Sequence, residues 1–97
     1  MDSQDVSRVL GAISQPTRYE IMQLLSKDAQ NGGQGMCAGA IAEKLGIQPA
    51  TLSFHLKDMT LKGVLTQRRE GRNLIYNAEM TTLIGALEFV VGDICGG

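Results

Sequence analysis

The spacing of apolar residues along the chain predicts a mainly helical protein. Apolar side chains recur every three or four residues over residues 5–14, 16–27 and 37–45, as on one face of an α-helix. Pro16 suits the first turn of the second helix, and Gly46 suits the left-handed cap that ends the third. The polar, glycine-rich stretch DAQNGGQG between these two helices is expected to be an ordinary surface connection.

A fourth helix is predicted to begin at Pro49, shortly after the third helix ends. Two helices joined by so tight a turn are typical of a helix-turn-helix, whose second helix enters the DNA major groove. Leu52, Leu56 and Met59 form a narrow apolar stripe that is expected to face the core. Thr51, Phe54, His55 and Asp58 are expected to face away from the core, with Ser53 and Lys57 on one flank of the exposed surface. Either these side chains contact a partner, or Phe54 packs under a neighbouring loop and the others are only solvated.

After Gly63 the apolar residues no longer follow a helical period. Two short strand-like runs, residues 64–67 and 74–77, flank a turn at Glu70-Gly71, and this predicts a β-hairpin. Its tip carries Arg68, Arg69 and Arg72. The expected fold is mainly α with a β-hairpin wing, a single winged helix-turn-helix domain over residues 1–97.

The last predicted helix, residues 80–94, has an apolar stripe wider than one small domain needs. Such a stripe, like that of the first helix, is expected to pack against a partner. The alternative is that both stripes pack only on the core of their own chain. The residues of the last stripe are Leu83, Ile84, Leu87, Val90, Val91 and Ile94.

Composition and charge narrow the partner and the location. Apolar residues make up 43% of the chain and charged residues 20%, which is ordinary for a soluble domain, and no apolar run is long enough to span a membrane. The acidic N-terminus does not resemble a signal peptide, so the cytoplasm is the expected location. The net charge is only −1, yet residues 57–72 hold five basic and two acidic side chains. This distribution favours a polyanion on one face of the molecule, although a solvated charge cluster would give the same count.

Enzyme activity finds no support in the sequence. The chain has no Walker loop, no GxSxG elbow and no HExxH pair. Its one histidine cannot supply the usual acid–base or metal-ligand sets. We therefore expect a binding protein and not a catalyst.

Three segments, AISQPTRYEIMQLL, IAEKLGIQPATLSFHLKDM and KGVLTQRREGRNLIYNA, resemble the ArsR/SmtB family of bacterial winged-helix repressors in sequence and in order. The resemblance covers essentially the whole chain. It implies a cytoplasmic homodimer that binds double-stranded operator DNA, blocks transcription, and is released by an inducer, often a metal or metalloid ion. A winged helix that docks another protein, with no operator of its own, is the alternative that the charge distribution disfavours.

The resemblance also implies roles for individual residues. The recognition-helix positions of the family correspond to Gln48, Thr51, Ser53, Phe54, His55 and Lys57, and the wing positions to Arg68, Arg69 and Arg72. Hydroxyls and an imidazole can hydrogen-bond to base edges or phosphates, and a phenyl ring can contact a thymine methyl group. Gln48 departs from the serine that caps this helix in many relatives. Dimerisation through the first and last helices would involve Val6, Val9, Leu10, Ile13, Leu83, Leu87, Val90, Val91 and Ile94. Two such recognition helices would read a pseudo-palindrome.

Three readings of Cys37 and Cys95 stay open, and on the first two of them the inducer acts on cysteine. Trivalent arsenic or antimony, or another thiophilic ion, prefers sulfur ligands. Arsenic and antimony take three thiolates, so two cysteines are an incomplete set unless they converge or a dimer mate contributes. On the second reading, oxidation joins the cysteines by a disulfide or polysulfide bridge, as in persulfide-sensing relatives. On the third, both are inert packing residues.

Overall fold

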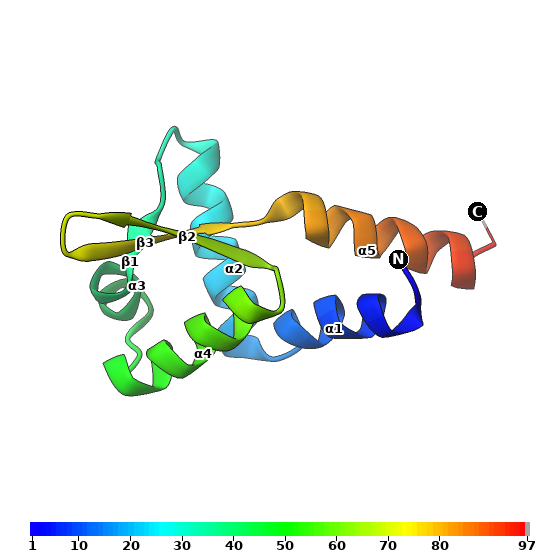
Figure 1. Cartoon of the computed structure of the whole chain (residues 1–97), viewed down its shortest axis with the longest axis horizontal. Helices are drawn as coiled ribbons and strands as arrows, with labels where there is room; N and C mark the ends of the chain where they lie inside the picture. The colour runs from blue at the N-terminus through cyan, green and yellow to red at the C-terminus, as the bar shows by residue number, and fades with distance from the viewer. Residues whose placement is uncertain (97) are drawn as a thin grey trace.

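A computed structural model describes residues 1–96 of the chain (Figure 1). These residues form helices and short strands in the order α1 (Ser3–Ile13), α2 (Pro16–Gln30), β1 (Met36–Cys37), α3 (Ala38–Leu45), α4 (Pro49–Leu61), β2 (Leu65–Glu70), β3 (Asn73–Ala78) and α5 (Met80–Ile94). The predicted mainly α winged helix-turn-helix is confirmed. No helix among residues 1–96 is both long enough and apolar enough to cross a membrane.

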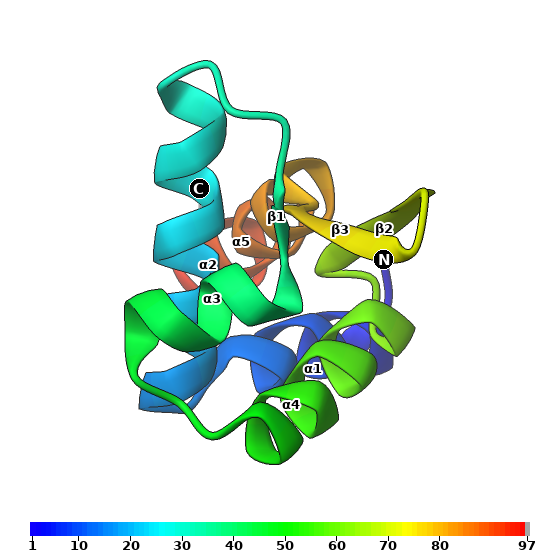
Figure 2. The same cartoon turned by 90° about the vertical axis from the view of Figure 1, so that its left-hand side faces the viewer.

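The core lies where α2, α3 and α4 meet the base of the sheet. Ile21 and Leu25 of α2, Ile41 of α3, and Leu52 and Leu56 of α4 are fully or almost fully buried there. Gly46, with φ of 65°, ends α3 in the left-handed conformation that glycine adopts without strain, as predicted. α3 packs against α4, and Figure 2 shows that α4 lies at the outer edge of the molecule.

The sheet is the hairpin β2–β3 with one additional strand. Its order is β1-β3-β2, with both pairs antiparallel. Glu70 pairs with Asn73, so the turn residues are Gly71 and Arg72, one position later than predicted. β1 was not predicted, because two residues carry no periodicity and the strand exists only through its pairing with β3.

The glycine-rich loop between α2 and β1 is bound to the wing, so the prediction of an ordinary surface connection is wrong. The Asp28 carboxylate accepts a hydrogen bond from the Gly35 amide at 2.9 Å. The Gln34 carbonyl accepts bonds from Arg68 at 2.6 Å and from Asn77 at 3.3 Å. Gly35 has a φ of 105°, and a Cβ there would come within 2.7 Å of the Tyr76 carbonyl oxygen. The loop is therefore attached to both strands of the hairpin through the Gln34 carbonyl.

Helices α1 and α5 lie side by side and extend together beyond the core (Figure 1). α1 begins with a capping box, in which the Asp2 side chain accepts from the Asp5 amide and the Asp5 side chain accepts from the Asp2 amide. α5 follows β3 almost directly, since only Glu79 separates them. Of all the residues of α5, only Ala86 is buried.

Candidate nucleic-acid interface

The outward face of α4 is polar and aromatic, as predicted. Gln48, Thr51, Ser53, Phe54 and Lys57 are all exposed, with 65% of the Phe54 surface accessible. Pro49 opens the helix at its first turn, and Gln48 makes no side-chain cap hydrogen bond, in keeping with its departure from serine. An exposed phenyl ring flanked by hydroxyls and an ammonium can meet both apolar and polar groups of a DNA groove.

The prediction that His55 faces away from the core is wrong. Its side chain is buried, at 9% relative exposure. At 100° per residue His55 lies only about 60° from Leu52 around the helix, and a core-facing stripe is commonly wider than 100°. The stripe of α4 therefore includes His55 beside its three apolar members, and the imidazole packs toward the core and not on the outward face of the helix.

His55 is held by Arg18, a buried residue of α2 for which the sequence pattern predicted no role. The Arg18 Nε donates to His55 Nδ1 at 3.0 Å, and another guanidinium nitrogen pairs with the Asp58 carboxylate. Lys62 donates to the same Asp58 oxygen at 2.9 Å. The available signal was the helical spacing of Arg18 from buried Ile21, which predicts a guanidinium on the core side of α2 that requires partners.

This network shifts two ionisation equilibria. Burial lowers the pKa of His55, and the nearby Arg18 charge lowers it further. Hydrogen bonds from Lys62 and then from Arg18 lower the pKa of Asp58. Because His55 Nδ1 accepts a hydrogen bond from an arginine, the neutral imidazole carries its proton on Nε2. The network thus holds a neutral histidine beside an ionised aspartate.

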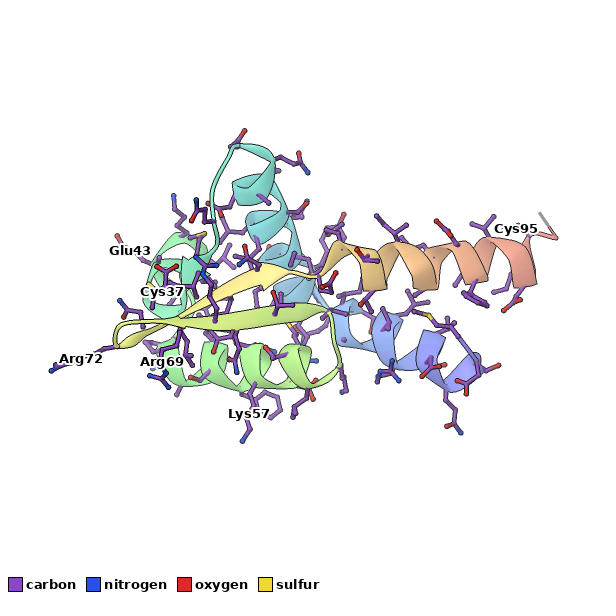
Figure 3. The ribbon with its side chains drawn as sticks, turned by 45° about the horizontal axis from the view of Figure 1, so that its top comes forward. Cys37, Glu43, Lys57, Arg69, Arg72 and Cys95 are labelled. Carbon is purple, nitrogen blue, oxygen red and sulfur yellow. The ribbon has the colours of Figure 1, made fainter. Side chains whose placement is uncertain are left out.

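The three wing arginines differ in their surroundings. Arg69 and Arg72 are exposed, and Figure 3 shows the Arg72 side chain extending from the hairpin tip. Arg68 instead binds the Gln34 carbonyl and pairs with Glu70 at 2.6 Å. Since successive side chains of a strand alternate between its faces, Arg68 lies on the face opposite Arg69. Within residues 1–96, no ion pair involves Arg69, Arg72 or Lys57, so these three cations are available to a polyanion.

A groove of about 500 Å³ separates α4 from the wing. Gln67 of β2 and Tyr76 of β3 line it from the wing, on the hairpin face that also carries Arg69. The α4 wall comprises Ser53, Phe54, Lys57, Thr60 and Leu61, and Leu74 completes the lining. The groove joins the exposed face of α4 to the wing in one continuous surface.

Comparison with known proteins agrees with this geometry. A family model described as a helix-turn-helix domain matches residues 13–68. The transcriptional repressor SdpR of Bacillus subtilis is 32% identical over 92 residues, which cover 95% of this chain and 96% of SdpR. The arsenical resistance operon repressor of Staphylococcus xylosus is 30% identical over 76 residues, covering 78% of this chain and 67% of that repressor.

Among solved structures, the homodimeric winged helix-turn-helix DNA-binding domain from Mycobacterium bovis matches with a TM-score of 0.71 and 30% identity. The match covers 93% of this chain and 80% of that one. The chain belongs to the ArsR/SmtB family of winged-helix transcriptional regulators. The predicted resemblance is confirmed, and the members of this family are DNA-binding regulators and not enzymes.

In this ArsR/SmtB chain α5 also presents a large exposed surface, but that surface is apolar, unlike the polar and aromatic face of α4. Its exposed apolar side chains are Met80, Ile84, Leu87, Phe89, Val91 and Ile94, and Ile94 is 78% exposed.

The prediction of Val9 as an interface residue is wrong. Val9 is fully buried within the protomer, where it belongs to the core. Leu10, Ile13 and Leu83 are half-buried and pack on that core. Phe89 was missed, because at 100° per residue it lies about 160° from the middle of the predicted stripe, on the other side of α5.

The two cysteines lie at opposite ends of the molecule (Figure 3). Cys37 is half-buried at the N-cap of α3, and Cys95 is exposed just after α5. A single protomer therefore does not bring the two cysteines together, and the bridge between them does not form in this conformation. Nor do residues 1–96 bring together three histidine, cysteine, aspartate or glutamate side chains that could hold a metal ion. Trivalent arsenic prefers three thiolates, so the donor set of a single protomer does not fit this ion.

Proposed function

We propose that this protein is a transcriptional repressor that binds operator DNA through α4 and the wing. On this proposal α4 enters the major groove, where Thr51, Ser53 and Phe54 contact base edges. Gln48 and Lys57 contact phosphates or bases at either side. Arg69 and Arg72 neutralise phosphates beside the groove. The observation that carries the proposal is that Lys57 of the exposed recognition helix lines the groove to the wing, that Arg69 and Arg72 are exposed on that wing, and that none of the three is in an ion pair among residues 1–96.

The repressor is proposed to act as a homodimer in the cytoplasm. The exposed apolar face of α5 supports this, because a surface of that kind is costly in water and is typical of an interface. The matched domain from Mycobacterium bovis is itself homodimeric. Two copies of α4 related by a twofold axis would read a pseudo-palindromic operator with half-sites about one helical turn, or a multiple of it, apart.

Cys95 is proposed as the residue through which a thiol-reactive inducer acts. Its support is its exposure and its position at the end of the α5 face. The test is release of DNA by arsenite, antimonite, cadmium or a polysulfide donor, for the wild type, Cys95→Ser and Cys37→Ser. Release that disappears only in Cys95→Ser supports the proposal. Release that persists in a double serine variant, or a wild type that responds to none of the four, contradicts it.

The DNA proposal is tested by selecting duplexes from a random pool with the wild-type protein. A repressor enriches a defined sequence, and its affinity for that duplex falls steeply as salt rises, with a slope of about 0.9 for each phosphate that it neutralises. The Arg69→Gln/Arg72→Gln variant should flatten this slope and weaken binding to every duplex alike. A wild type that enriches nothing and binds no duplex would instead favour a module that docks another protein.

A further inference from the structure

We propose that Arg18 is a positioning residue for base recognition, acting through His55 on the exposed ring of Phe54. The inference rests on the proposed function, because it concerns how α4 is presented to DNA. Arg18 belongs to α2 and touches no part of the DNA-facing surface itself, since it is only 8% exposed. Its effect on DNA must therefore pass through the side chains that it binds.

Both hydrogen-bonding partners of Arg18 belong to α4. His55 and Asp58 are one helical turn apart, and each receives a bond from the same guanidinium group. A buried charge is strongly disfavoured unless it is paired, so separating the guanidinium from these partners would lower the stability of the folded protein strongly. A planar group fixed at two points one turn apart sets the rotation of α4 about its own axis. That rotation decides which side chains face outward.

The contact between His55 and Phe54 carries this order to the surface. The two rings meet edge to face, with their centroids 5.9 Å apart and their planes at 67°. Such aromatic pairs are favourable beyond the area they bury. Because Arg18 fixes the imidazole through Nδ1, the imidazole in turn offers the phenyl ring a fixed surface. Phe54 is then held in one orientation before DNA arrives, so less side-chain freedom is lost on binding.

A merely structural role for Arg18 is separable, because Asp58 has a second cation. In an Arg18→Met variant the Asp58 carboxylate keeps Lys62, while His55 loses its only hydrogen-bond donor from α2. The Lys62→Met variant is the matched control. It removes one cation from the same carboxylate, with the same new side chain, and leaves the Arg18–His55–Phe54 chain untouched. An Arg18→Lys variant keeps the charge but cannot reproduce the two-point attachment.

The experiment compares affinities of the full-length variants for the duplex selected by the wild type, for its single-base variants, and for a random duplex. We expect Arg18→Met and Arg18→Lys to lose about fivefold or more of the discrimination between the selected duplex and at least one single-base variant. Binding to the random duplex should stay within about twofold. Lys62→Met should keep the wild-type discrimination. Losses that are equal on all duplexes, or unchanged discrimination, would overturn the proposal.

A spectroscopic measurement keeps the test decisive if a variant is less stable. His55 is the single histidine of the chain, so its ring nitrogens give one assignable set of nitrogen-15 signals. In the wild type we expect Nδ1 to be the unprotonated acceptor, and in Arg18→Met we expect mixed tautomers and altered Phe54 ring signals. Unaltered His55 and Phe54 signals would overturn the proposal. A wild type that selects no duplex would overturn the proposed function and this inference together, whereas a selective wild type with selective Arg18 variants overturns only the inference.

Discussion

Helices α4 and α5 have similar lengths but opposite relations to the core. α4 buries four side chains, Leu52, His55, Leu56 and Met59. α5 is more apolar, yet it buries only Ala86. The reason is position: α4 packs one side against α3, β2 and α1, whereas α5 runs past the core beside α1 (Figure 1). Apolar content therefore does not by itself indicate which helix stabilises the protomer.

The comparison also separates two kinds of surface. α4 uses one side for the core and leaves the other for a polyanion, with Lys57 and the exposed ring of Phe54 on it. α5 buries little of its surface in its own core and leaves an apolar face exposed, which suits contact with another apolar surface. Substitutions that look alike on the two helices should therefore have unlike effects.

The largest expected difference is between two leucine truncations. Leu52→Ala should lower the free energy of unfolding by about 2–5 kcal/mol at every protein concentration, because the residue is fully buried in the protomer. Leu87→Ala, at a site 47% exposed, should instead reduce the dependence of stability on concentration. Urea denaturation at several concentrations measures both. Equal and concentration-independent losses would show that α5 serves the protomer as α4 does.

A charge on each helix sharpens the comparison further. Leu87→Glu would bury an unpaired carboxylate in a dimer, so we expect monomer or aggregate in analytical ultracentrifugation. Leu61→Glu is the control, because Leu61 is even more exposed, at 75%, but lies on α4. It should leave the sedimentation unchanged. A wild-type mass for Leu87→Glu would contradict the assignment of the α5 face to an interface.

Two arginines of one hairpin should differ in DNA binding by a smaller amount. Arg72→Gln removes a free cation at the tip and should lower the salt slope of binding by about one unit for each phosphate that is no longer neutralised. Arg68→Gln should change the slope less, because Arg68 is already bonded to Gln34 and Glu70. It should instead loosen the wing from the glycine-rich loop. Fluorescence anisotropy on duplex DNA over a salt series distinguishes the two, and an Arg68→Gln slope as low as that of Arg72→Gln would contradict the assignment.

The smallest expected effect is the pH dependence that His55 imposes. Its pKa is lowered in the folded protein from an ordinary 6.5, so below about pH 6.5 the unfolded chain takes up a proton that the folded chain resists. The free energy of unfolding should therefore fall as the pH drops below 6.5, and level off once the lower folded pKa is passed. His55→Asn should remove this part of the profile. A wild-type profile that is flat across this range would contradict the burial of a neutral histidine.

The sequence predicted the order of the elements because long periodic segments and strong end signals agreed with one another. Pro16, Pro49 and Gly46 mark helix ends through local backbone chemistry, which needs no tertiary information. The hairpin with its arginine-rich tip was likewise predictable from neighbouring residues, because its turn and its two strands are adjacent in the sequence. The exposed face of α4 was mostly predictable, since Phe54 and Lys57 lie opposite the apolar stripe.

The errors arose where distant segments meet. His55 was placed outward because the stripe of α4 was drawn too narrow, and because the partner of its imidazole, Arg18, lies 37 residues away in the sequence and on another helix. The strand β1 and the attachment of the glycine-rich loop depend in the same way on contacts with the hairpin. Val9 was assigned to an interface because periodicity marks an apolar side without saying which neighbour covers it.

The attachment of the glycine-rich loop determines where a label could be introduced. Asn31 and Gly32 lie at the exposed end of the loop, and open space surrounds Gly32. A short peptide tag inserted between them would extend into solvent and leave the hairpin in place. The same tag after Gln34 would pull away the carbonyl that Arg68 and Asn77 share. Three residues along the chain thus separate a neutral reporter position from one that releases the wing.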